Sequence, residues 1–114
     1  MKKRFLLFMN IILMKSKIKG GFILLDIKKG VKSFYVGDNE EEPLAKMEFV
    51  YNGDEVIINH TFVSEQLRGQ NVGGQLLEKI VSLARETNKK IIPICPYAKA
   101  KLNKNDKYLD VLKK

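Results

Sequence analysis

The sequence has little cysteine, histidine, proline and tryptophan, and these absences exclude several classes of protein. Its 114 residues include one cysteine, one histidine, three prolines and no tryptophan. One cysteine cannot form an intramolecular disulfide, and a lone thiol is typical of a reducing compartment, so we expect a cytoplasmic protein. One histidine and one cysteine cannot build a metal site of recognisable spacing, so no metal is expected. No apolar run reaches the ~18 residues that a membrane-spanning helix needs.

Positive charge is unevenly distributed along the chain. Residues 1–32 contain nine lysine and arginine side chains and one acidic residue, Asp26, whereas the remaining 82 residues carry twelve basic and twelve acidic side chains. A reader of nucleic acid carries basic and base-reading groups on its folded surface, so this distribution disfavours that class. From Arg68 to the end, eleven basic residues outnumber four acidic ones. That half would attract a compact polyanion, or it is simply a solvated basic surface.

The first 21 residues differ from the rest and predict an N-terminal extension. Lys2-Lys3-Arg4 precedes an apolar stretch, 5–14, as in a signal peptide, but lysines rather than small residues follow it. Secretion or membrane anchoring is therefore the weaker interpretation, and a start at Met14 is another. We expect residues 22–114 to form one domain, because a chain of this length buries one core.

Periodicity predicts strands in the first half of this domain. Residues 32–36 are strand-like, and apolar side chains alternate with others from 45 to 51, which is typical of a half-buried strand. Asn52-Gly53 follows and favours a type I′ hairpin turn, in which both residues have positive φ. The return strand, 55–63, is expected to place four side chains on one face: Val56, Ile58, His60 and Phe62.

Helical spacing dominates the second half. Apolar residues recur from 76 to 84 at the spacing of an amphipathic helix, and Asn88 is a plausible left-handed stop. Residues 91–95 predict a short buried strand that Pro93 interrupts. Short helical segments are predicted to follow it, over 97–104 and 106–112.

A glycine-rich loop, residues 63–74, joins the return strand to this helix. Its backbone N–H groups and the positive end of the helix dipole would bind a phosphate or diphosphate. The loop has neither the Gly-Lys-Ser/Thr of a P-loop nor the Gly-x-Gly-x-x-Gly of a dinucleotide fold. By composition alone, a plain strand-to-helix turn explains it equally well.

Three motifs in this region match a known family. Arg68-Gly69-Gln70-Asn71-Val72-Gly73-Gly74 resembles the Arg/Gln-x-x-Gly-x-Gly/Ala pyrophosphate loop of the Gcn5-related N-acetyltransferases (GNAT). The short YjdJ-like members of that superfamily are similar from about residue 27 to 112, through His60-Thr61-Phe62-Val63, Cys95-Pro96-Tyr97 and Tyr108-Leu109-Asp110. Asn71 stands at the first signature glycine, and asparagine tolerates the left-handed conformation.

The resemblance implies a fold and a cofactor. The fold would be α+β: a mixed, mostly antiparallel sheet with a central helix packed on it and short C-terminal helices. Acetyl-CoA would lie between two diverging strands, its pantetheine paired with backbone near Phe62 and Val63. Its diphosphate would bind Arg68, Gly69, Gln70, Asn71, Val72, Gly73 and Gly74. The acceptor would be a small-molecule or protein amine, and a homodimer could supply walls that a short chain lacks.

Two side chains are candidates for catalysis. Cys95 would end its strand beside the thioester, where a thiolate could accept the acetyl group, although a lone cysteine also serves as a small buried filler. His60 could act as general base toward the amine, or it could be a hydrogen-bonded core residue. Tyr97 and Tyr108 could protonate the departing CoA thiolate or merely pack.

We therefore expect an acetyl-CoA-dependent N-acetyltransferase, and two other functions stay open. A non-catalytic acetyl-CoA sensor or acyl carrier would keep the pocket without an efficient acceptor. An adaptor for nucleic acid or membrane surfaces would act through the basic N-terminus and would depend steeply on salt.

Overall fold

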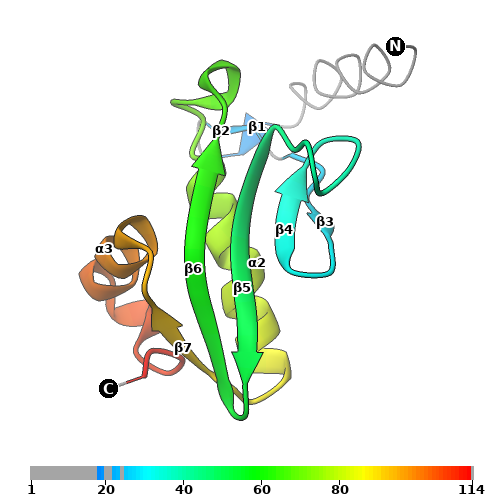
Figure 1. Cartoon of the computed structure of the whole chain (residues 1–114). Coiled ribbons are helices and arrows are strands. Elements are labelled where there is room, and N and C mark those ends of the chain that lie inside the picture. The colour runs from blue at the N-terminus through cyan, green and yellow to red at the C-terminus, as the bar shows by residue number, and fades with distance from the viewer. Residues whose placement is uncertain (1–17, 20–21, 24, 114) are drawn as a thin grey trace.

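A computed structural model describes residues 18–19, 22–23 and 25–113 of the chain (Figure 1). Most of the expected extension, residues 1–21, lies outside these described residues. Its described part, β1 (Ile18–Lys19), pairs in antiparallel fashion with β2 (Phe22–Ile23) as a separate two-stranded sheet.

A five-stranded sheet is the framework of the domain. Its strands lie in the order β3-β4-β5-β6-β7, and all neighbours are antiparallel except the parallel pair of β6 and β7. The bounds are β3 (Lys28–Lys29), β4 (Ser33–Val36), β5 (Ala45–Asn52), β6 (Glu55–Val63) and β7 (Lys90–Pro93). The mixed, mostly antiparallel sheet expected from the sequence is confirmed.

One long helix, α2 (Val72–Glu86), covers one face of this sheet and packs on β4, β5, β6 and β7 (Figure 1). The chain then turns at Asn88, whose φ of 55° confirms the predicted left-handed stop. Among the described residues there are three shorter helical segments: η1 (Glu65–Leu67), α3 (Pro96–Lys104) and η2 (Asp106–Tyr108).

The core lies between the sheet and α2. On β5, Ala45, Met47 and Phe49 are buried at alternate positions, as the period-2 pattern predicts. The helix buries its apolar stripe against them: Val72, Gly73, Leu76, Leu77, Ile80, Val81 and Ala84. Since each fully buried Leu or Ile side chain contributes about 1.5–3 kcal/mol, this stripe is the main force that holds α2 on the sheet.

The hairpin between β5 and β6 differs from the predicted type I′ turn. Asn52 still pairs with Glu55, so the two turn residues are Gly53 and Asp54. Among Asn52, Gly53 and Asp54, only Gly53 has a positive φ, 61°. A positive φ at the first turn residue alone is the pattern of a type II′ turn. The prediction that Asn52 also has a positive φ is wrong, because the ladder runs one residue further than the dipeptide suggests.

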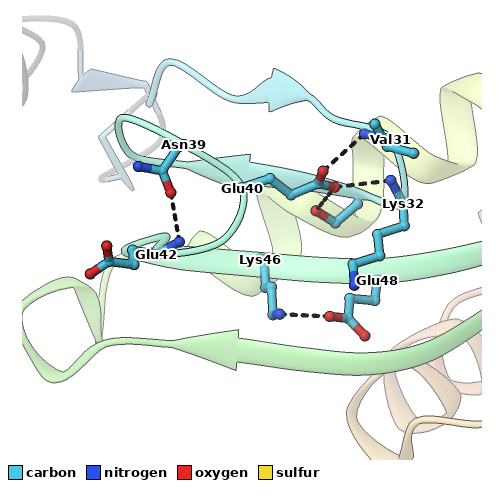
Figure 2. A network of polar contacts seen from close by, with 8 residues as sticks. Val31, Lys32, Asn39, Glu40, Glu42, Lys46 and Glu48 are labelled. Atoms are coloured by element: carbon cyan, nitrogen blue, oxygen red, sulfur yellow. Dashed lines mark hydrogen bonds and ion pairs between the residues drawn. The ribbon is translucent and has the colours of Figure 1, made fainter.

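The turn between β3 and β4 is held by a carboxylate from the following loop (Figure 2). Glu40 accepts hydrogen bonds from the backbone N–H groups of Val31 (3.0 Å) and Lys32 (2.9 Å) and from the Ser33 hydroxyl (2.6 Å). A β-carbon at Gly30 would come within 2.4 Å of the Glu40 carboxyl carbon. The glycine thus provides the space that the carboxylate occupies.

The C-terminal segment covers the outer edge of β7. The N–H of Ile91 donates to the carbonyl of Val111 (2.6 Å), and the N–H of Lys113 donates to the carbonyl of Ile91 (2.9 Å). Arg85 of α2 forms a two-pronged ion pair with Asp110, at 2.9 and 3.0 Å. The edge of β7 that faces away from β6 is therefore occupied by the chain itself.

Candidate functional site

The sheet opens where β6 and β7 part. Their parallel pairing ends at Ile58 and Pro93, and proline has no N–H with which to continue a ladder. The next two N–H groups, those of Ile94 and Cys95, both turn back to the Ile58 carbonyl, at 2.9 and 3.0 Å. β6 continues to Val63 beyond the last β7 residue. Within the described part of the chain, no strand therefore pairs with this edge of its final residues, where the Val63 carbonyl accepts a hydrogen bond from the Arg68 side chain (3.4 Å) and the Thr61 N–H donates to the Cys95 sulfur.

A β-bulge lies on β6 at the same level. Glu48 is opposite His60 and Phe49 is opposite Ile58, so Asn59 has no register partner on β5. One extra residue moves every later side chain of a strand to the other face. The expected common face of Val56, Ile58, His60 and Phe62 is therefore wrong beyond Ile58.

The bulge decides which β6 side chains face α2. Thr61 lies opposite Met47 and Val63 lies opposite Ala45, and both of these β5 residues are fully buried in the core. His60 is exposed, and Phe62 is 40% exposed on that same outer face. The outer face also carries Glu48, whose hydrogen bond with Lys46 (2.6 Å) lowers the pKa of its carboxyl.

The loop from β6 to α2 has the conformation that its residues suggest. Gly69 has a φ of 82°, and Asn71 is left-handed with a φ of 57°, as predicted for the position of the signature glycine. Asn71 precedes the first helical residue, Val72, yet its side chain does not cap the helix. The N–H groups of the first turn of α2 therefore carry the positive end of the helix dipole without a side-chain cap.

A groove of about 340 Å³ lies between this loop and the opening of the sheet. Six of the predicted cofactor residues line it together with three others; the whole set is Thr61, Val63, Leu67, Arg68, Gly69, Asn71, Val72, Gly73 and Tyr97. Three predicted residues, all described, are not in its lining. Phe62 points to the outer face, the Gln70 carbonyl accepts a hydrogen bond from the Gln75 side chain (3.3 Å), and Gly74 lines a second groove.

The second groove, of about 410 Å³, adjoins the first at Asn71. It runs between α2 and the α3–η2 segment. Three lysines line it, Lys101, Lys104 and Lys107. Lys107 forms an ion pair with Glu78 (3.1 Å). The basic excess of the C-terminal half is thus partly gathered beside the loop.

Cys95 lies at the opening of the sheet, but its local structure differs from the expected strand end. The strand stops at Pro93, Ile94 is 61% exposed, and Cys95 is the residue that precedes α3. Its thiol is buried, and its sulfur lies 3.2 Å from the Thr61 hydroxyl oxygen. Burial raises the pKa of the thiol. The Thr61 hydroxyl and the backbone N–H groups of Ala98, Tyr97 and Thr61 together outweigh burial, so the net pKa of the thiol is lowered.

The two candidate tyrosines lie in different surroundings. Tyr97 lines the first groove. Burial raises the pKa of its phenol, and the nearby Cys95 raises it further. The Tyr108 hydroxyl donates a hydrogen bond to Glu78 of α2 and lines the second groove. The structure therefore places Tyr97, and not Tyr108, next to Cys95.

The residue that the sequence did not single out is Thr61. The structure brings Cys95 together with Thr61, while His60 lies on the outer face opposite Glu48. Only the bulge distinguishes the two neighbours, and strand periodicity within β6 carries no signal of it.

Among the described residues, no group of three or more metal-binding side chains occurs, and no helix has the length and apolar character needed to cross a membrane.

Known proteins resemble the chain over most of its length. The family model described as GCN5-related N-acetyl-transferase matches residues 33–111. The solution NMR structure of a GCN5-like candidate N-acetyltransferase from Staphylococcus aureus is 46% identical, with a TM-score of 0.68. That similarity covers 78% of this chain and 88% of the other. No curated protein matches the chain.

Proposed function

The chain belongs to the GCN5-related N-acetyltransferase family, and we propose that it transfers an acetyl group from acetyl-CoA to an amine through the thiol of Cys95. The observation that carries this proposal is the position of Cys95. Its buried thiol lies where β6 and β7 part, beside a groove that leads to the N-terminus of α2.

The residues around the opening fit the acyl donor in three respects. The edge of β6 near Val63 has no strand partner on the β7 side, and its one side-chain bond there, from Arg68 to the Val63 carbonyl, is long (3.4 Å), so an extended, amide-containing arm such as pantetheine can pair with it. The loop from Arg68 to Gly74 and the uncapped first turn of α2 suit a diphosphate. The second groove, with Lys101, Lys104 and Lys107, suits the phosphorylated nucleotide end. When bound, acetyl-CoA supplies the acetyl group as an activated thioester.

Cys95 then acts as a nucleophile. Its thiolate sulfur attacks the thioester carbonyl carbon, a new C–S bond forms, and the bond to the CoA sulfur breaks. The acetyl group is now on Cys95. A neutral amine attacks the same carbon, loses a proton, and releases the Cys95 thiolate. The proton that the amine loses balances the one that the departing CoA thiolate takes up, and exchange with solvent restores the groups that carry them.

Two further side chains move protons in this proposal. Tyr97 lines the groove, and its raised pKa keeps the phenol protonated near neutral pH, so it can donate a proton to the departing CoA thiolate. His60 is exposed on the outer face, so in this proposal it takes the proton from an amine that approaches the opening from that face. Tyr108 is not assigned this role because its hydroxyl is bonded to Glu78.

The experiment combines calorimetric titration with mass spectrometry of the intact chain. The full chain and Cys95→Ala are titrated with acetyl-CoA, incubated with it, and treated with neutral hydroxylamine, which cleaves thioesters. We expect both proteins to bind and only the wild type to gain a hydroxylamine-sensitive acetyl group. If the wild type releases or absorbs no heat at millimolar acetyl-CoA, the proposal that acetyl-CoA is the acyl donor is overturned. An acetyl group that resists hydroxylamine, or that Cys95→Ala gains equally, would overturn the covalent route.

A further inference from the structure

A side-chain contact spans the opening of the sheet at the level where backbone pairing has ended. The Thr61 hydroxyl oxygen, on β6, lies 3.2 Å from the Cys95 sulfur, at the start of α3. From this geometry we infer that Thr61 is the positioning residue of Cys95: its hydroxyl donates to the thiolate and holds the sulfur directly behind the groove, which Thr61 itself lines. The catalytic meaning of this inference rests on the proposed function, but the contact can be tested without acetyl-CoA.

The bulge is what brings Thr61 to this place. In a regular strand His60 would share the face of Ile58, and Thr61 would point to the outer face. The extra residue, Asn59, reverses this alternation and places Thr61 opposite the fully buried Met47. The end of β7 and the bulge therefore act together. The end of β7 leaves β6 without a neighbouring strand, and the bulge directs the Thr61 hydroxyl toward Cys95.

The chemistry of the pair favours an ionised sulfur. A neutral thiol and a hydroxyl can each donate to the other, whereas a thiolate only accepts, so the Thr61 proton must then point at sulfur. A hydrogen bond to the charged form of a group favours that form. Because threonine is β-branched, its χ1 is stiff, and the hydroxyl is held in place better than that of a serine would be.

Few other groups can produce the same effect. Tyr97, from α3, is the titratable side chain that the structure places beside Cys95, and its raised pKa keeps it neutral over most of the useful pH range. Along β5 and β6, the ionisable Glu48 and His60 lie on the outer face of the sheet. The remaining support comes from the backbone N–H groups of Ala98, Tyr97 and Thr61 itself, which a side-chain substitution at position 61 leaves in place.

The test is the pH dependence of alkylation of Cys95 by iodoacetamide in the full chain. Cys95 is the sole cysteine, so the rate reports on one thiol. We compare wild type, Thr61→Ser and Thr61→Val with a control, Thr87→Val. In the wild type, the Thr87 hydroxyl donates to the Leu83 carbonyl at the far end of α2 (2.7 Å). The midpoint of the profile is the readout, since intrinsic nucleophilicity itself changes with the pKa of the thiol.

We expect a wild-type midpoint below the ~8.5 of an unperturbed cysteine. Thr61→Val should raise it by about one unit, as expected for loss of one hydrogen bond to a charged group, whereas Thr61→Ser and Thr87→Val should keep it low. If Thr61→Val disturbs folding, Thr61→Ala removes the same hydroxyl without adding bulk and decides the question. A midpoint that neither Thr61→Val nor Thr61→Ala moves would overturn the inference.

Failure of this inference is distinguishable from failure of the proposed function. A shifted midpoint in Thr61→Val, without any acetyl adduct on wild-type Cys95, would support the positioning role and overturn the acyl-transfer route. An acetyl adduct on wild-type Cys95, with an unshifted midpoint in Thr61→Val, would support acyl transfer and overturn the role of Thr61.

Discussion

The phenol of Tyr97 lies directly against Gly73 in the first turn of α2. A β-carbon built at Gly73 would come within 2.6 Å of the Tyr97 hydroxyl oxygen and 2.7 Å of its Cζ. Both residues line the candidate groove. The glycine that the family motif places beside the diphosphate is therefore also required by the packing of this chain alone.

This relationship predicts a reversal of sign between two backgrounds. Gly73→Ala should destabilise the wild type by about 1–3 kcal/mol, because the added methyl displaces Tyr97. In a Tyr97→Ala background the same change should be neutral or stabilising by up to about 1 kcal/mol, since alanine favours a helix over glycine. Denaturant unfolding of the four proteins measures the coupling. Equal costs of Gly73→Ala in both backgrounds would show that Tyr97 does not fill this space in solution.

The left-handed residues at the two ends of α2 provide a matched pair of tests. Asn71→Gly should keep the loop shape, since glycine adopts a φ near 57° freely, and acetyl-CoA should bind at least as tightly. Asn71→Val should destabilise the chain by about 1–2 kcal/mol and weaken binding, because a β-branched residue disfavours positive φ. Calorimetric titration and thermal unfolding measure the two effects.

The control is Asn88, which has a φ of 55° at the other end of the helix. Asn88→Val should cost a similar stability while acetyl-CoA affinity stays unchanged. If Asn71→Val and Asn88→Val alter affinity equally, the loop has no special part in binding and the proposed diphosphate position is wrong.

Glu40 makes a pH-dependent contribution to stability. Its hydrogen bond with Ser33, together with those from the backbone of Lys32 and Val31, outweighs burial and lowers the pKa of the carboxyl. A carboxyl whose folded pKa is depressed stabilises the fold above its unfolded pKa of about 4.3, and this contribution disappears as the pH falls through the folded pKa. We therefore expect Glu40→Gln to lower the free energy of unfolding by about 1 kcal/mol at neutral pH, since solvent screening keeps the contribution of this partly exposed group small.

The measurement is thermal unfolding of wild type and Glu40→Gln from pH 7 down to about pH 3. The difference in melting temperature should be largest at neutral pH and should shrink below about pH 4. Glu41→Gln, which changes the exposed neighbouring carboxylate, is the control and should follow the wild type. A gap between wild type and Glu40→Gln that stays constant with pH would contradict the role of the charge.

Local sequence patterns determined most of the elements and the conformation of the loop. The alternation on β5, the helical spacing of α2 and the left-handed φ of Asn71 and Asn88 all follow from sterics within a few residues. The fold class also followed from sequence, through the family motifs, and the order of the sheet and its parallel pair agree with it. These features depend on neighbours along the chain or on a shared motif.

Tertiary structure alone decided the composition of the candidate site. Whether Thr61 or His60 faces Cys95 depends on the bulge at Asn59, which exists only in the register between β5 and β6. The position of Cys95 ahead of α3 depends on where β7 stops pairing with β6. A single strand has a fixed period of two, but which of its residues is left unpaired is set by the partner strand, distant in sequence. The sequence therefore identified Cys95 as the candidate nucleophile, and the pairing of the strands placed Thr61 rather than His60 beside it.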